Sequence, residues 1–247
     1  MPVASNTRRA HGEAMLMVVI VILVVSGALL AGAAWGIFGR LHKGTEGFLV
    51  ALAGGALLLS VVTELIEPSL DRAGAFHSTA GVALGAIVFA IADYVIDERW
   101  GPNSGGGLLA AITLDGIPEN LALGVALIGA GAPEVAALAG SILLSNLPEA
   151  AGGARAMAQG GQSKLRVFAL WAATATLLSV AALAGNLLLE GASEEWLALI
   201  RCFAAGAVIA SLATEVFPQA FRDDRHWAGI ATALGVILAL LLGELGG

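Results

Sequence analysis

Two carboxylates lie four residues apart inside a long apolar run, in the stretch LDGIPEN. A helix would place Asp115 and Glu119 on the same face, one turn apart. A second apolar run contains Asn146 and Glu149 at a spacing of three residues, in the stretch SNLPEA. Carboxylate and amide oxygens in this arrangement are typical ligands of a hard or borderline divalent cation.

A proline lies inside each of these pairs and adds a further kind of ligand. Pro118 and Pro148 have no N–H group, so each leaves the carbonyl oxygen four residues earlier without its helical donor. These oxygens belong to Leu114 and Leu144. No histidine or cysteine lies close in sequence to either pair. The sequence therefore predicts a cation site made of oxygen atoms.

The composition indicates that the helices carrying these residues lie in a lipid bilayer. The chain has 247 residues, of which 58% are hydrophobic and 13% are charged. An ordinary soluble domain has about 25% charged residues. The single cysteine excludes an intrachain disulfide. We expect an integral membrane protein with no nucleic-acid partner.

Apolar runs long enough to span a membrane recur along nearly the whole chain. A transmembrane helix needs about 20 largely apolar residues. We therefore predict an all-α, polytopic membrane protein with a single transmembrane domain over residues 1–247. Its eight predicted helices cover residues 15–39, 47–67, 78–97, 107–131, 134–159, 165–190, 195–219 and 226–246.

Lys and Arg residues are unevenly distributed between the predicted loops. The loops after the first, third, fifth and seventh helices contain eight of the 12, and the opposite side has four. Because cytoplasmic loops are enriched in Lys and Arg, the first group is predicted to be cytoplasmic. With an even number of helices, both termini would then be extracytoplasmic.

Acidic side chains at membrane depth are the strongest indication of function. An ionisable group near the bilayer centre costs about 2.5–3.5 kcal/mol, so groups that persist there usually face a cavity. Asp115 and Glu119 fall in the middle of the fourth predicted helix, and Glu149 falls near the middle of the fifth. Glu64 lies near the outer end of the second helix, and Glu215 near the inner end of the seventh. The sequence places no Lys or Arg beside them at depth, which favours a bound cation.

Two pairs of segments are related by internal repetition. GALLLSVVTELIEP and GAVIASLATEVFP match at several positions with a constant separation, among them Glu64 with Glu215. LDGIPEN and LSNLPEA also match, at Pro118 with Pro148 and at the glutamates that follow. The matched helices would cross the membrane in opposite directions. Such inverted repeats are typical of secondary transporters.

These motifs resemble those of the ZIP (Zrt/Irt-like) divalent metal transporters, particularly their bacterial members. LDGIPENLALG is similar to the family pattern His-Asn-x-Pro-Glu-Gly, and NLPEA is similar to its acidic-x-Pro-Glu pattern. The resemblance covers essentially the whole chain. It implies a three-plus-two-plus-three helix bundle that forms a homodimer in a prokaryotic plasma (inner) membrane. It also implies transport of zinc, iron, manganese or a similar ion toward the cytoplasm, with the metal as substrate and no permanent cofactor.

The resemblance implies roles for individual residues. Asp115 stands where the family usually has a metal-binding histidine, and Gly116 stands where it often has an asparagine. Glu119 matches the glutamate of the family motif. Asn146 and Glu149 match the family's ligands on the fifth helix.

The second and seventh helices add candidate pathway residues under the same resemblance. Glu64 falls about where many members have a metal-binding histidine, and Glu215 matches an acid of the seventh helix. Asn120 replaces a glycine and adds an amide group. Because Asp115 replaces an imidazole, the site should favour manganese, iron or magnesium-like ions more than a histidine-containing site would. Zinc also accepts carboxylate ligands.

Three other classes of function are compatible with parts of the sequence: a carrier of another solute, an intramembrane enzyme and a structural scaffold. A proton- or sodium-coupled carrier of another solute could use Asp115 and Glu119 as proton sites, but carriers of organic anions usually need a deep Lys or Arg. An intramembrane aspartyl protease could use Asp93 and Asp115, but LDGI is not the expected Gly-x-Gly-Asp context. A metal-dependent hydrolase would normally need histidines in its helices. A structural scaffold would leave the central acids unexplained. We therefore expect metal transport rather than an enzyme or a scaffold.

Overall fold

A computed structural model describes residues 3–40, 42–100, 105–128 and 135–246. The predicted all-helical class is confirmed, because the regular elements in these residues are α- or π-helices and no strand occurs among them. The elements are α1 (Val3–Phe38), α2 (Lys43–Val61), η1 (Val62–Ile66), α3 (Glu67–Trp100), α4 (Gly105–Ala126), α5 (Ala136–Gln159), α6 (Lys164–Leu189), α7 (Glu194–Ser211), η2 (Leu212–Val216), α8 (Phe217–Asp223) and α9 (Ala228–Gly246).

Several of these helices have the length and composition of membrane spans. Within the described residues, four segments qualify, and a shorter apolar helix follows at Ala228–Glu244. Helices α4 and α5 are outside this group, and they are the two that carry the polar residues of the predicted site. The helices are consistent with an integral membrane protein, whereas the number of eight spans stays a prediction. The four segments are Met15–Phe38, Lys43–Arg99, Lys164–Leu189 and Glu194–Asp223.

The predicted ends at 159 and 246 agree with those of α5 and α9, and two predicted helix starts lie next to serine caps. Ser163 Oγ accepts a hydrogen bond from Arg166 N at 3.4 Å, and Ser193 Oγ accepts one from Trp196 N at 3.4 Å. Such caps satisfy N–H groups that the first turn leaves free. As a result α6 and α7 each begin one residue before the predicted position. The predicted end of the fourth helix and start of the fifth fall at 129–134, outside the described residues.

Helix α1 differs from its prediction. It begins at Val3 rather than at residue 15. The added segment is polar but contains alanine, arginine and glutamate, which are good helix formers. At its N-terminal end the helix therefore extends beyond the apolar segment that was predicted to span the membrane.

The connection between the second and third predicted helices also differs from the prediction of a loop over 68–77. Helical structure continues from η1 through α3, and Gly74 is the residue with non-helical dihedral angles inside α3 (φ 76°, ψ 158°). Glycine adopts such a positive φ without steric cost. The chain folds back at this residue, and Ser78 Oγ donates to Ser69 O at 3.0 Å across the reversal. One glycine thus replaces the expected loop.

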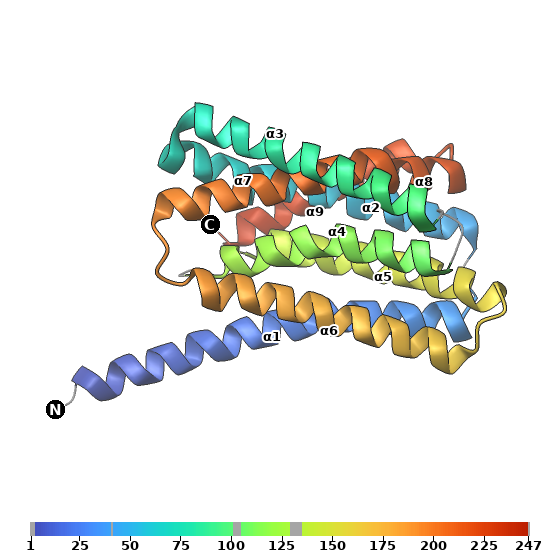
Figure 1. The fold of residues 1–247 in the computed structure, drawn as a ribbon, viewed down its shortest axis with the longest axis horizontal. Coiled ribbons are helices and arrows are strands. Elements are labelled where there is room, and N and C mark those ends of the chain that lie inside the picture. Colours follow the sequence, from blue (N-terminus) through green and yellow to red (C-terminus); the bar gives the residue numbers. More distant parts are fainter. Residues whose placement is uncertain (1–2, 41, 101–104, 129–134, 247) are drawn as a thin grey trace.

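The helices pack in two groups that lie one above the other in Figure 1. In the lower group, α1 packs on α5 and α6, and α4 packs on α6. In the upper group, α3 packs on α7, and α2 packs on α9 and α8. The groups meet where α2 contacts α5 and where α4 contacts α7. Polar residues on these four helices can therefore face one another across the boundary.

Glycines let α3 and α7 approach closely. A methyl group added at Gly85 would overlap the backbone of Phe203, and one added at Gly206 would overlap the backbone of Val82. The two glycines thus serve the same contact from opposite helices. Small residues at helix contacts are typical of packing in membranes, where close approach supplies the attraction.

The helices end at two faces of the bundle, which we name after their glycine turns. The Gly160 end contains the turn between α5 and α6 and the connection between α8 and α9. The Gly191 end contains the turn between α6 and α7 and the reversal at Gly74. Both ends of the described chain also lie at the Gly191 end (Figure 1).

Candidate functional site

The two repeat-related glutamates lie in the two π-helical turns. Glu64 is in η1 and Glu215 is in η2. Each is followed by a proline, Pro68 or Pro218, which cannot donate to the carbonyl four residues back. The residue before each proline donates its N–H group five residues back instead. These bonds run from Glu67 N to Val62 O and from Phe217 N to Leu212 O.

A cavity of about 80 Å³ brings three of the predicted acids together. We call it the Asp115 cavity. It lies between α2, α4, α5, η2 and α8, and among the described residues its lining contains three carboxylates but no Lys or Arg. The lining residues are Val50, Ala53, Ile112, Asp115, Ser145, Glu149, Gly153, Glu215, Val216 and Gln219.

Asp115 is the most enclosed acid of the cavity lining. Its side chain is buried, and its Oδ1 has no hydrogen-bond partner among the described residues. The carboxyl group faces the side chains of Ser211 and Glu215, and the charge of Glu149 acts on it. A buried polar atom without a partner costs free energy unless something else satisfies it. The orphaned oxygen therefore marks a place for a ligand.

Two other residues of the predicted site, Glu119 and Asn146, lie outside the cavity lining. Glu119 is buried on α4, and its charge acts on both Asp115 and Glu149 although it is not part of the cavity lining. Asn146 is also buried, and its Nδ2 donates to Val25 O on α1 at 3.1 Å. The amide of Asn146 therefore joins α5 to α1 in this structure.

The predicted pathway residues are spread over a wider region. Asn120 is buried, its Nδ2 donates to Gly116 O at 2.9 Å, and its Oδ1 has no partner among the described residues. Gly116 lies against Leu178 of α6, whose side chain a methyl group would contact. Glu64 is half-buried in η1 and is not among the residues that line the Asp115 cavity. The structure thus brings Glu215, but not Glu64, to the central acids.

Sequence reasoning did not include Asp93 in the metal site, yet the structure places it beside the acids. Asp93 lies on α3, and its carboxyl group faces that of Glu215. Glu215 in turn faces Asp115, so three carboxyl groups from α3, η2 and α4 follow one another. The signal was available, because Asp93 is an acid inside the third predicted span. Nothing in the sequence indicated that this face of α3 meets η2.

The acids do not form a finished coordination shell. Among the described residues, no group of three or more His, Cys, Asp and Glu side chains is arranged to hold a metal ion. The lining of the Asp115 cavity offers oxygen atoms only, from carboxylates, a serine and an amide. Oxygen ligands suit hard divalent cations, and these ions commonly retain water molecules in their coordination sphere.

Neither the protein-family models nor the curated proteins contain a match to the chain. The likeness to ZIP transporters therefore stays a prediction from the motifs.

Proposed function

We propose that this protein transports divalent metal cations across a membrane toward the cytoplasm. The observation that carries the proposal is the Asp115 cavity, in which Asp115, Glu149 and Glu215 from three different elements meet with no Lys or Arg in the lining. Like charges at this range repel one another unless a cation or protons lie among them. A divalent cation would balance most of that charge and would satisfy the orphaned Oδ1 of Asp115.

The proposed ligands are Asp115, Glu119, Asn146 and Glu149. Glu119 and Asn146 are not in the cavity lining, so in this proposal their side chains move to complete the shell. Glu215 would bind the ion as it leaves the central site toward the inner side. Glu64 would attract the ion from the outer side before it reaches the central site. Hard oxygen ligands favour manganese, iron or magnesium-like ions over zinc by comparison with an imidazole site.

The proposed architecture is the eight-span bundle with inverted repeats in a three-plus-two-plus-three order. The π-helical turns at Glu64 and Glu215 support the repeat, since both repeat copies depart from α-helix at the same motif. Helices α2, α4, α5 and α7 meet at the boundary between the two packing groups. Transporters of this kind usually bind their substrate where the repeats meet. A homodimer in a prokaryotic plasma membrane is part of the same proposal.

The proposed direction follows from the charges at the Gly160 end. The loops richer in Lys and Arg lie at this end, which would therefore be cytoplasmic. The cavity also extends from Asp115 toward this end, because Val50, Gly153 and Gln219 each lie nearer to it than the acids do. An ion that has reached Asp115 would thus continue toward the cytoplasm.

Metal uptake by purified protein in liposomes tests the transport function. We expect uptake of at least one of zinc, manganese, iron, cobalt, nickel and magnesium above that of protein-free liposomes. Glu149→Gln should remove the uptake, whereas Glu195→Gln, a change at an exposed glutamate of α7, should leave it unchanged. If none of these ions enters, the proposal is wrong. If protons cross the membrane while no metal is taken up, a proton-coupled carrier of another solute is favoured instead.

Labelling of single cysteines tests the topology. Ala75→Cys and Lys164→Cys, each in a Cys202→Ser background, place exposed thiols at the Gly191 end and the Gly160 end. A membrane-impermeant reagent should label them from opposite sides. Labelling of both from one side would contradict the eight-span arrangement.

A further inference from the structure

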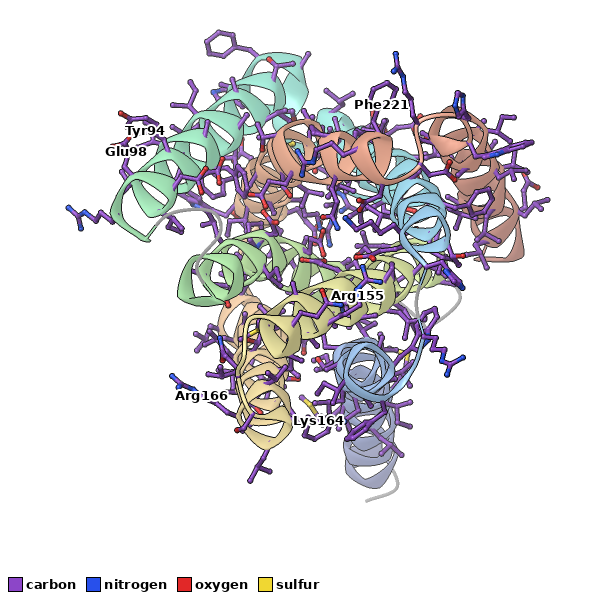
Figure 2. The ribbon with its side chains drawn as sticks, turned by 90° about the vertical axis from the view of Figure 1, so that its right-hand side faces the viewer. Tyr94, Glu98, Arg155, Lys164, Arg166 and Phe221 are labelled. Atoms are coloured by element: carbon purple, nitrogen blue, oxygen red, sulfur yellow. The ribbon has the colours of Figure 1, made fainter. Side chains whose placement is uncertain are left out.

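Glu46, which is buried, and Arg155, which is partly buried, form an ion pair between α2 and α5 at the Gly160 end. Arg155 Nη2 donates to Glu46 Oε2, and the two side chains are 19% and 4% exposed. The Glu46 carboxylate rests against α5 at Gly152, where a methyl group would overlap it. Figure 2 looks onto this end and shows Arg155 among the helices, whereas Arg166 points away from them. A buried ion pair is weak evidence for stability alone, because desolvation offsets its attraction.

The ion pair lies directly between the Asp115 cavity and the loops of the Gly160 end. Val50, one turn along α2 from Glu46, lines the cavity, and so does Gly153, two residues before Arg155. Arg155 follows Glu149 by six residues, which is about 9 Å along a helix. An ion that left the cavity toward this end would pass between the helices that the pair joins.

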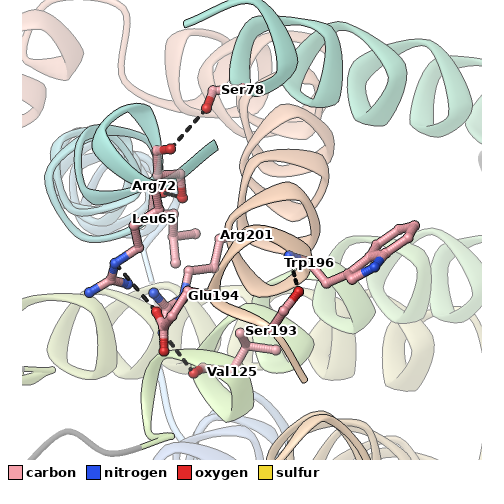
Figure 3. A network of polar contacts seen from close by, with 9 residues as sticks. Leu65, Arg72, Ser78, Val125, Ser193, Glu194, Trp196 and Arg201 are labelled. Carbon is pink, nitrogen blue, oxygen red and sulfur yellow. Dashed lines mark hydrogen bonds and ion pairs between the residues drawn. The ribbon is translucent and has the colours of Figure 1, made fainter. Parts of the chain in front are cut away.

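A counterpart of this contact lies at the Gly191 end. Arg201 of α7 is buried, and its Nη2 donates to Val125 O of α4 at 3.2 Å. Figure 3 shows this bond beside the exposed ion pair of Arg72 with Glu194. We call these four residues the Arg201 network. Its acceptor is a neutral carbonyl, and the Nε of Arg201 has no partner among the described residues.

The two contacts join corresponding helices of the internal repeat, and one residue of each contact matches in position. Val125 and Arg155 are related by the same separation as Pro118 and Pro148. Helix α2 corresponds to α7 in the other repeat pair, through Glu64 and Glu215. An arginine therefore joins corresponding helices at each end of the molecule, α5 to α2 at one end and α7 to α4 at the other. The contact at the Gly160 end differs because its acceptor is charged.

We propose that Glu46 and Arg155 are the gate of the ion path at the Gly160 end, an inference that rests on the transport function proposed above. They are positioning residues that do not bind the ion at the central site. While paired, they hold α2 against α5 beyond the cavity, and their separation opens the cavity toward the Gly160 end. Pairing also neutralises the guanidinium, which would otherwise repel a cation on its way out.

The test measures access to the cavity without using metal. Ser145→Cys in a Cys202→Ser background places a thiol in the cavity lining, and an impermeant thiol reagent is applied from the Gly160 side of sealed proteoliposomes. Glu46→Gln and Arg155→Gln should each raise the labelling rate at least about tenfold. Loss of one partner of such a pair weakens the contact between α2 and α5, so a larger fraction of molecules should have the cavity open to the reagent. The exposed residue Arg72 supplies the matched control, and Arg72→Gln should leave the rate unchanged.

Two further variants separate gating from loss of the fold. The combination of Glu46→Gln with Arg155→Gln leaves no unpaired buried charge, so it should fold even if a single variant does not. It should also label fast. The exchange Glu46→Arg with Arg155→Glu restores opposite charges and should return the rate toward that of the parent.

The outcomes distinguish this inference from the proposed function. Labelling at the parent rate in both single variants and in the double variant, with normal metal uptake, overturns the gate alone. Fast labelling of the variants together with metal uptake by the parent supports both. If the parent takes up no metal, the transport function is wrong and the gate of an ion path falls with it, whatever the labelling rate.

Discussion

The Asp115 cavity and the Arg201 network both place charged side chains at contacts between helices, but the charges differ in sign and in how they are balanced. In the network, Arg72 pairs with Glu194 at 3.4 Å and Arg201 donates to Val125 O. In the cavity, carboxylates from α4, α5 and η2 meet without a basic residue in the lining. The network therefore joins helices through partners that the protein itself supplies, although Arg201 Nε has none among the described residues. The carboxylates of the cavity have no basic partner among the described lining residues, and this difference favours the cation site proposed above.

The largest effect is expected from removing a carboxylate of the proposed metal site. Glu149→Ala and Glu119→Ala should each abolish metal uptake, because each removes a negative oxygen ligand that the remaining residues cannot replace. Uptake into liposomes measures the effect, and a thermal unfolding curve in detergent checks that each variant is folded. Glu194→Ala in the Arg201 network is the control and should retain uptake. Transport at the wild-type rate by both the Glu149 and the Glu119 variant would show that the site lies elsewhere.

A smaller effect, on stability rather than on uptake, is expected at Arg201. Arg201→Met removes the bond to Val125 O near the C-terminal end of α4, where a cation is favourable. The loss should lower the free energy of unfolding by about 1–3 kcal/mol. Denaturation of the purified protein measures it, and the ratio of zinc to manganese uptake should stay the same. A changed ratio would mean that the network takes part in ion binding.

The next effect is a change in ion preference rather than in rate. Asp115→His replaces a hard carboxylate oxygen with a borderline nitrogen, so uptake should shift toward zinc over manganese. Competition between the two ions in liposomes measures the shift. Asp71→His, an exposed substitution outside the cavity, is the matched control. An unchanged ratio in the Asp115 variant would refute the argument from ligand chemistry.

The smallest effect is expected from the exposed ion pair of the Arg201 network. Arg72 and Glu194 have side chains that are 41% and 69% exposed. Surface pairs of this kind contribute about 0–1 kcal/mol, since water and salt screen them. Arg72→Gln with Glu194→Gln should therefore leave stability within that range and uptake unchanged. A larger loss of stability, seen by denaturation, would show that the network is less exposed in the membrane.

The sequence predicted much of the secondary structure because its signals are local. Apolar runs define the helices, and Ser163 and Ser193 begin α6 and α7 by bonding to N–H groups three residues later. The acids of the cavity were also predictable, since an ionisable residue at membrane depth stands out against apolar neighbours. Asp115, Glu149 and Glu215 were named on this ground, and the structure places all three around one cavity.

Features that depend on distant contacts could not be predicted in this way. Glu46 and Arg155 are 109 residues apart, and no periodicity links a charge near one helix end to a charge near another. Asp93 meets Glu215 only because α3 packs on α7. The reversal at Gly74 was missed for a different reason, since one residue with a positive φ leaves almost no trace in composition.

The reciprocal glycines of α3 and α7 have a consequence for the tolerance of the gene to mutation. Gly85 and Gly206 each lie against the backbone of the other helix, and any added side chain would push the two helices apart. Every single-nucleotide change in a glycine codon that is not silent adds a side chain or stops translation. These two codons should therefore be among the least variable in the gene, although neither residue is among those that line the Asp115 cavity.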